Sequence, residues 1–258
     1  MKSSIYVSTS ATSTASTDSF FETFASALEQ EVHDYAYIHL RGAATPLCAH
    51  YDIMFLQRLI DQVAKVLEYR VVNGIECSTE VAGADVIARV RKGRTLICNG
   101  LHQVDTQSAQ WAESLRKLLD TSGKTSARIF YTNALEQAYG MHLDPFYTLT
   151  LQVSGSKLWK IARRREPIEV EHLNHSILAP SPGTVENHPC GQLVGPEPGP
   201  DLFDEILLEP GDALLLPPGV WHHVIPVTES FSVALDVVPT NQRNEPLEIA
   251  LICHQPQT

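Results

Sequence analysis

The order of hydrophobic and polar positions divides the chain into an N-terminal helical part and a C-terminal part rich in strands. Apolar residues recur at helical spacing after Ser19-Phe20-Phe21-Glu22, which is typical of a capping box, and again after Asp52. Asp105 can cap a third helix. After Gly123 short β-rich pieces follow one another almost to the end. Helices followed by strands predict a mostly β fold, a sandwich or barrel with a helical layer on one side.

The expected strands are short runs of β-branched and aromatic residues with turn residues at their ends. They cover residues 69–72 (before the Asn73-Gly74 turn), 94–98, 128–131, 148–153, 158–161, 206–208, 213–216, 222–225 and 231–238. The segment 180–200 interrupts this pattern with six prolines and four glycines. It is expected to be a connecting loop, with a substrate-facing lid as the alternative.

A chain of 258 residues with 43 % hydrophobic residues can form one large domain with a sizeable core. Residues 1–17 are rich in Ser and Thr and are predicted to be a flexible tail. Residues 18–258 are predicted to form a single domain. Its helical part covers about 18–125 and its β core about 126–240.

The candidate chemistry starts with His142-Leu143-Asp144. On an extended strand the imidazole and the carboxylate two residues apart share a face, and they supply two ligands of a 2-His-1-carboxylate iron site. A third ligand is expected from the His222-His223 pair. Adjacent strand residues face opposite ways, so only one of the pair can bind the metal, and spacing alone does not choose between them.

Strand alternation also makes a prediction for Lys157. If Ser154-Gly155 is a two-residue hairpin turn, Gln152 lies opposite Lys157 and Thr150 lies opposite Trp159. Thr148, Thr150 and Gln152 would share the face of Asp144, so Lys157 would point into the same cavity. A buried lysine needs an anion there, and the distal carboxylate of 2-oxoglutarate would serve. The alternative is a surface lysine after the turn.

Net charge and cysteine usage exclude several classes. A net charge of -11 argues against binding to nucleic acid or to an anionic membrane surface. The five scattered cysteines contain no C-x-x-C, which argues against a disulfide framework and a cysteine zinc site. No secretory signal is recognisable at the N-terminus and no apolar run approaches the roughly 20 residues of a membrane span. We therefore expect a soluble cytoplasmic protein.

The motifs together resemble the JmjC-type cupin oxygenases, specifically the ribosomal-oxygenase-like subgroup. The resemblance covers roughly residues 85–240. Its motifs are Thr95 to His102, Gly140-Met141-His142-Leu143-Asp144, Leu151 to Trp159, and the run from Glu209-Pro210-Gly211-Asp212 to Trp221-His222-His223.

The resemblance implies a double-stranded β-helix that binds Fe(II) through His142, Asp144 and His222, with His223 in a structural role. It implies that Lys157, fifteen residues after His142, holds 2-oxoglutarate, with weaker matches at Thr148 and Thr132. The implied reaction consumes dioxygen and 2-oxoglutarate, releases succinate and CO2, and hydroxylates an unactivated C–H bond.

The implied substrate is an amino-acid side chain of a protein or peptide. The chain departs from the family pattern at Arg128 and Phe130, where the family tends to show Asn and Tyr, and only about twenty residues follow Val238. A small-molecule or natural-product hydroxylase of the same mechanism, a metal-dependent cupin that uses no 2-oxoglutarate, and a non-catalytic cupin-fold binding module are the alternatives.

Other candidate residues are given structural roles. His50 and His102 are expected to be partly buried histidines, and the H-x-x-H of residues 172–175 is expected to lie in an exposed loop. Asp236 shares a strand face with Ser232 and is expected either to border the pocket or to cap an edge.

Overall fold

The structure of the protein is a computed structural model. It describes residues 5–8, 16–30, 37–63, 68–73, 76–79, 95–133, 141–165, 186–187, 193–194 and 202–239. The helices are α1 (Thr17–Gln30), α2 (Thr45–Cys48), α3 (Ile53–Val63), the 3-10 helix η1 (Leu101–Gln103) and α5 (Thr106–Leu118). The strands are β1 (Ile5–Ser8), β2 (Ile38–Arg41), β3 (Glu68–Asn73), β4 (Glu76–Thr79), β5 (Thr95–Asn99), β6 (Gly123–Thr132), β7 (Tyr147–Ser154), β8 (Lys157–Arg165), β9 (Glu186–Asn187), β10 (Leu193–Val194), β11 (Phe203–Leu208), β12 (Ala213–Leu216), β13 (Val220–Pro226) and β14 (Ser230–Pro239).

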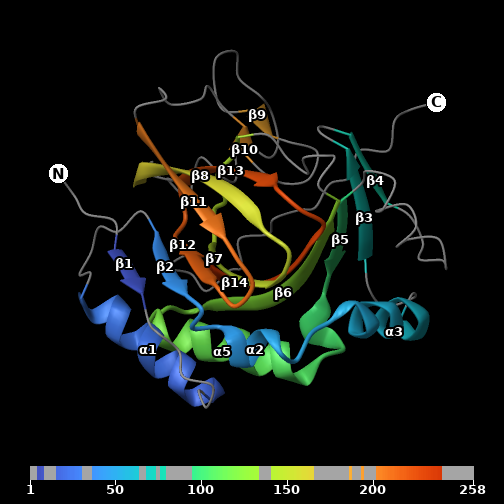
Figure 1. Cartoon of the computed structure of the whole chain (residues 1–258), viewed down its shortest axis with the longest axis horizontal. Helices are drawn as coiled ribbons and strands as arrows, with labels where there is room; N and C mark the ends of the chain where they lie inside the picture. The colour runs from blue at the N-terminus through green and yellow to red at the C-terminus, as the bar shows by residue number, and fades with distance from the viewer. Residues whose placement is uncertain are drawn as a thin grey trace.

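Two sheets make up the β core. Among the described residues a nine-stranded sheet has the order β1-β2-β12-β7-β14-β6-β5-β3-β4, and a three-stranded sheet has the order β11-β8-β13. The chain passes from one sheet to the other between β7 and β8, between β11 and β12, and at both ends of β13 (Figure 1). This alternation is the jelly-roll connectivity of a double-stranded β-helix, and the predicted fold class is confirmed.

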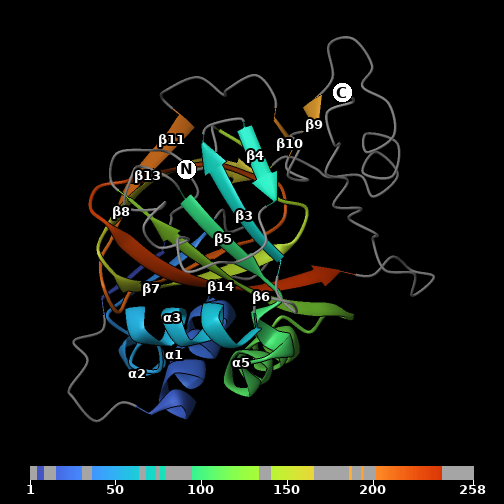
Figure 2. The same cartoon turned by 90° about the vertical axis from the view of Figure 1, so that its right-hand side faces the viewer.

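The helical layer covers the face of the large sheet that points away from the small one. Figures 1 and 2 show α1, α2, α3 and α5 gathered on one side of the strands. Phe20, Phe24 and Leu115 are fully buried against the strand residues Leu149 and Leu235. Strand alternation therefore sends the apolar residues of β7 and β14 toward the helices and leaves the other face for polar side chains. Among the described helices none is long and apolar enough to cross a membrane.

The hairpin expected at Ser154-Gly155 is wrong. β7 pairs with β12 and β14, whereas β8 pairs with β11 and β13, so Gln152 does not lie opposite Lys157. The two strands belong to different sheets, and the segment 154–156 carries the chain between them. Lys157 nevertheless points inward, because β8 faces β7 across the interior and its side chain is 4 % exposed. The inward prediction for Lys157 is therefore correct although its premise was not.

The N-terminal part shows three further differences. Helix α1 begins at Thr17, and the Ser16 hydroxyl accepts from the backbone N–H of Ser19, so the cap precedes the predicted one. Strand β1 lies inside the segment predicted to be a flexible tail and pairs in parallel with β2. Strand β2 itself was not predicted, since a run of only four residues gives a weak periodic signal. The cap predicted at Asp105 and the helix start predicted near Asp52 are confirmed, and the Asp52 carboxylate also accepts from the backbone N–H of Phe55.

The Glu209–Asp212 turn fixes the entry to β12. The Asp212 carboxylate accepts from the backbone N–H groups of Gly42 (2.8 Å) and Glu209 (3.1 Å) and contacts His39 Nε2 at 3.1 Å. Burial raises the pKa of Asp212, but these hydrogen bonds outweigh it and hold the pKa below its usual value. The turn thereby ties β2 to the strand that leads into the site.

We expect Asp212→Ala to lower the free energy of unfolding by roughly 3 kcal/mol, because it leaves two backbone N–H groups and His39 without this acceptor. Urea denaturation measures the change. Glu205→Ala is the matched control, since its ion pair with Lys160 is exposed and contributes little. A loss below about 1 kcal/mol for Asp212→Ala would contradict this role.

Candidate active site

Backbone hydrogen bonds hold the His142–Asp144 segment against the start of β13. The N–H of His142 donates to the carbonyl of His222 at 3.0 Å, and the N–H of His222 donates back to the carbonyl of His142 at 2.7 Å. The N–H of Gly219 donates to the carbonyl of Asp144 at 2.9 Å. Residues eighty positions apart in sequence are thus fixed side by side.

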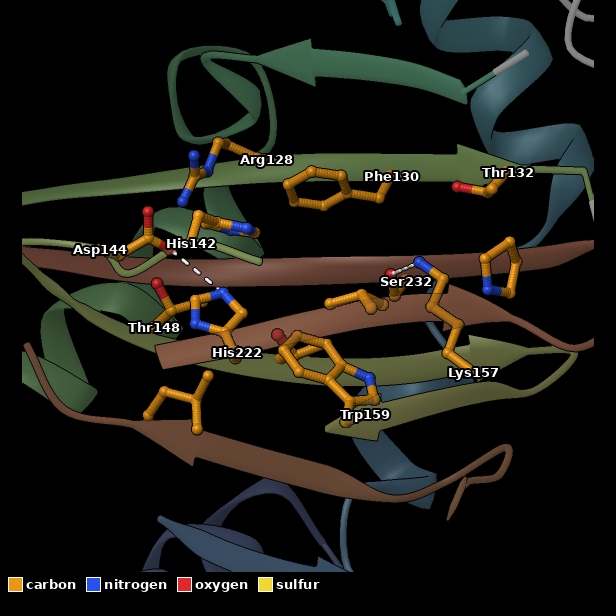
Figure 3. Close-up of a pocket in the computed structure, with 14 residues that line it drawn as sticks. Arg128, Phe130, Thr132, His142, Asp144, Thr148, Lys157, Trp159, His222 and Ser232 are labelled. Atoms are coloured by element: carbon orange, nitrogen blue, oxygen red, sulfur yellow. Dashed lines mark hydrogen bonds and ion pairs between the residues drawn. The ribbon is translucent and has the colours of Figure 1, made fainter. Parts of the chain in front are cut away.

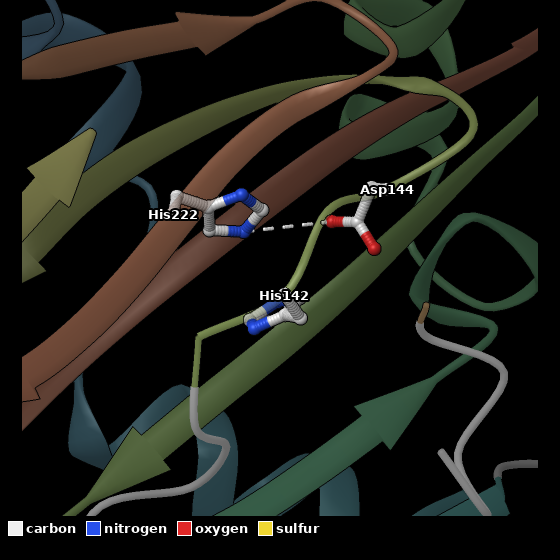
Figure 4. Close-up of side chains that lie close together, drawn as sticks. All are labelled: His142, Asp144 and His222. Atoms are coloured by element: carbon white, nitrogen blue, oxygen red, sulfur yellow. Dashed lines mark ion pairs between the residues drawn. The ribbon is translucent and has the colours of Figure 1, made fainter. Parts of the chain in front are cut away.

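The side chains of these residues converge on one point. One ligand atom from each of His142, Asp144 and His222 lies within 4.8 Å of the other two (Figure 4). His222 Nε2 lies 3.8 Å from Asp144 Oδ2, and the two imidazole centroids are 4.2 Å apart. Nδ1 of His222 is 2.9 Å from the carbonyl of Val220 and donates to it, so the lone pair is on Nε2, facing Asp144.

Burial sets the electrostatics of this group. It raises the pKa of Asp144, against the opposing charges of His222 and Arg128, and it lowers the pKa of His222. Asp144 Oδ1 is buried and makes no hydrogen bond to any described residue. Two imidazoles beside a carboxylate with an unsatisfied oxygen fit a divalent cation, which would compensate the buried charge. Three protein ligands leave coordination positions for other molecules.

A pocket extends from these three side chains between the two sheets. It encloses about 680 Å³, part of it open to solvent. Figure 3 shows Arg128, His142 and Asp144 at one end and Lys157 with Ser232 at the other. The lining residues are Arg128, Phe130, Thr132, His142, Asp144, Thr148, Thr150, Lys157, Trp159, Leu216, His222, Val224, Pro226 and Ser232.

Lys157 is the cation at the far end of the pocket. Its Nζ donates to Ser232 Oγ at 2.7 Å and lies 5.7 Å from the centroid of the Phe130 ring. No carboxylate of the described residues pairs with it. Burial alone lowers the pKa of Lys157 to about 7. An ammonium group held this way is stabilised by an anionic ligand.

Comparison with known proteins places this geometry in a family. A family model of the JmjC domain matches residues 101–244, which is more than half of the chain. The chain belongs to the JmjC domain family.

Two curated proteins are similar to this chain in sequence. The uncharacterized protein YxbC of Bacillus subtilis is 29 % identical over 154 residues, 58 % of this chain and 46 % of YxbC. The bifunctional lysine-specific demethylase and histidyl-hydroxylase NO66 of Aedes aegypti is 30 % identical over 127 residues, 48 % of this chain and 18 % of NO66. The matched stretch is therefore less than half the length of these curated relatives.

Solved structures show the same fold. The structure of Escherichia coli ycfD aligns with a TM-score of 0.61 at 15 % identity, over 84 % of this chain and 53 % of that one. The structure of YcfD, described as a ribosomal oxygenase, in complex with cobalt and 2-oxoglutarate aligns with a TM-score of 0.55 at 15 % identity, over 80 % and 49 % of the two chains.

The JmjC pocket contains both threonines that the resemblance singled out. Thr132 and Thr148 line it and are nearly fully buried. Thr148 Oγ1 donates to Asp236 at 2.9 Å, and Thr132 Oγ1 accepts from Thr95 at 3.3 Å. Gln152 was expected on the same face, but its Nε2 donates to the carbonyls of Ser154 and Gly155 and it does not line the pocket.

The other histidines of the described residues do not line the JmjC pocket. His223 is half-buried and pairs across the small sheet with Lys160, whose side chain is exposed. His102 Nδ1 accepts from the N–H of Ala127, and His50 contacts Asp105. The H-x-x-H at 172–175 lies outside the described residues, as does most of the segment 180–200.

Two features of the JmjC site were missed or left open in the sequence. The Trp159 ring stacks on His222 with centroids 5.7 Å apart, and the alternation Lys157-Leu158-Trp159 could have placed it on the pocket face. Asp236 neither lines the pocket nor caps an edge. It is 2 % exposed and lies outside the pocket lining, where it forms an ion pair with Arg128, which does line the pocket.

Proposed function

We propose that the protein is an Fe(II)- and 2-oxoglutarate-dependent dioxygenase that hydroxylates an unactivated C–H bond, with succinate and CO2 as co-products. One observation carries the proposal. A 2-His-1-carboxylate group and a buried lysine occupy opposite ends of one pocket in a JmjC domain. A cupin enzyme without 2-oxoglutarate has no need of the lysine, and a non-catalytic module has no need of the three convergent ligands.

The proposal assigns roles to most of the polar residues that line the pocket. His142, Asp144 and His222 hold the metal, and Lys157 with Ser232 binds the distal carboxylate of 2-oxoglutarate. Thr132 and Thr148 line the space between them. When bound, iron together with 2-oxoglutarate and dioxygen supplies the oxidation. The protein orients these groups, and its apolar wall excludes water.

The proposed substrate is an amino-acid side chain of a protein or peptide. NO66 is named a lysine-specific demethylase and histidyl-hydroxylase, and YcfD is described as a ribosomal oxygenase. The first name refers to lysine and histidyl groups, and the second refers to the ribosome. They support a protein substrate for this chain, over a small molecule. The cytoplasm as its location is part of the proposal.

Anaerobic titration tests the proposal. The metal-free full-length protein receives Fe(II) and then 2-oxoglutarate, and the visible metal-to-ligand charge-transfer absorption is recorded. We expect a band that needs both additions and that is absent in His222→Ala. Bound iron without a band would favour the cupin enzyme that uses no 2-oxoglutarate. Failure to bind iron would favour the binding module.

Binding of 2-oxoglutarate is expected to weaken as the pH rises above about 7. A dianion binds the protonated lysine, and the free protein loses this proton as the pH passes the lowered pKa of Lys157. Above that pH the affinity should fall by up to about tenfold per pH unit. Calorimetry in buffers of different ionisation enthalpy should show proton uptake at pH 8. Net proton release on binding at pH 8, or a constant affinity for 2-oxoglutarate between pH 6 and 9, would contradict the role of Lys157.

A further inference from the structure

Arg128 lines the pocket, and neighbouring side chains hold its guanidinium group in place. Its Nε lies 2.8 Å from Asp236 Oδ2, and its Nη2 lies 2.9 Å from Asp236 Oδ1. Asp236 in turn accepts from Thr148 at 2.9 Å and from Ser126 at 3.3 Å. Asp236 therefore orients the guanidinium group, and Thr148 and Ser126 in turn orient Asp236.

Two aromatic rings fix the guanidinium further. Its central carbon lies 5.0 Å from the Phe146 ring centroid and 5.6 Å from the Phe130 ring centroid. Cation–π contacts of this kind favour a planar arginine over a lysine. A structural ion pair alone gives little net stability when it is this deeply placed, because burial of the two charges costs most of what their attraction provides. Because the buried ion pair adds little stability, its presence points to a functional role for the positive charge of Arg128.

The pocket meets Arg128 and does not meet its partner carboxylate. Arg128 lines the pocket with a side chain 20 % exposed, whereas Asp236 is 2 % exposed and lies outside the lining. Figure 3 shows the guanidinium next to Asp144 and His142, at the opposite end from Lys157. The carboxylate of Asp144 faces His222, where a bound divalent cation would neutralise it. Among the described residues that line the pocket, Arg128 is thus the cation beside the metal site.

We infer that Arg128 selects the substrate: the group oxidised in this pocket belongs to a substrate that places a carboxylate beside Arg128, and basic side chains are rejected. This inference rests on the proposed function and assigns its substrate class. A guanidinium presents its N–H donors in a planar fork that suits a carboxylate, and Arg128 lines the pocket with this group partly exposed. A lysine or arginine of the substrate would meet a like charge that cannot move away, which is a repulsive element of specificity.

Two small probes test the inference without knowledge of the natural substrate. The full chain is loaded with Mn(II) and 2-oxoglutarate under nitrogen, and N-acetyl-glutamate methylamide or N-acetyl-arginine methylamide is titrated. Paramagnetic broadening of the probe protons reports binding close to the metal and involves no turnover. We expect the apparent Kd of the glutamate probe to be at least about tenfold lower. Equal broadening by both probes, including none by either, would overturn the inference, and so would a preference for arginine.

Variants separate charge from structure. Arg128→Gln should abolish the preference for the glutamate probe, and Arg128→Lys should retain part of it. Arg128→Gln leaves the buried Asp236 carboxylate without its ion-pair partner. The double variant Arg128→Gln/Asp236→Asn therefore removes both charges, and it should show no preference either. Lys160→Gln on the outer side of β8 is the matched control and should keep the full preference. Retention of the preference in both neutral variants would overturn the role of Arg128.

The Fe(II) and 2-oxoglutarate titration separates the two levels of failure. If the charge-transfer band forms but neither probe is preferred, only the substrate assignment is wrong. If no band forms, the proposed function fails and the substrate inference falls with it.

Discussion

Replacing Asp144 by alanine is expected to abolish 2-oxoglutarate turnover while leaving the fold intact. Asp144 supplies the only carboxylate of the three-residue group among the described residues. Loss of a metal ligand should exceed the roughly 10–100-fold effects typical of residues that only support ligands. Succinate formation, measured with excess Fe(II), should fall below detection. His142→Ala should behave in the same way, and retained activity in either variant would disprove the ligand assignment.

The metal-free protein gives a second, independent readout. Burial raises the pKa of Asp144, so this group costs stability in the metal-free protein; the cost shrinks as the pH falls below the raised folded-state pKa and is gone below the unfolded-state pKa. Asp144→Asn removes the charge and should leave the metal-free melting temperature equal or higher. Mn(II) should raise the melting temperature of the wild type and of the surface control Glu205→Gln, but not that of Asp144→Asn. An equal metal-induced rise in all three would contradict the site.

The features that local sequence patterns could predict are those with local causes. The helix start near Asp52, the helix cap at Asp105 and the strand β12 follow from short-range periodicity and capping chemistry, and each was found where expected. His142 and Asp144 are two residues apart, so their shared face also follows from local geometry. Which histidine of the 222–223 pair faces them depends on how β13 lies against the 142–144 segment, and spacing could not decide it.

The features that could not be predicted depend on pairing between distant strands. Ser154-Gly155 is a good turn sequence, and nothing nearby in the chain shows that β7 pairs with β12 and β14 instead of β8. The ion pair between Arg128 and Asp236 also depends on distant pairing, because the register of β14 against β6 brings the two side chains together. Pairing between distant strands therefore explains both the wrong hairpin prediction and the ion pair that was not predicted.

Replacing Lys157 by alanine is expected to raise the apparent KM for 2-oxoglutarate by roughly thirtyfold or more. Removing one partner of a buried charge pair costs about 2 kcal/mol or more, because the remaining charge stays desolvated without compensation. The effect should fall mainly on KM, since Lys157 lies at the opposite end of the pocket from His142 and Asp144 (Figure 3). Initial rates of succinate formation over a wide range of 2-oxoglutarate concentration measure both constants.

The matched control for this experiment lies three residues further along the same strand. Lys160 faces outward, with a side chain 40 % exposed and an ion pair to Glu205, so Lys160→Ala removes an equal charge without reaching the pocket. Its KM should match that of the wild type. Because burial disfavours the Lys157 ammonium in the ligand-free protein, Lys157→Ala should not lower the melting temperature by removing charge, and any loss should reflect the packing of its aliphatic stem. An unchanged KM in a folded Lys157→Ala protein would show that Lys157 does not bind 2-oxoglutarate. No residue would then be assigned to its distal carboxylate.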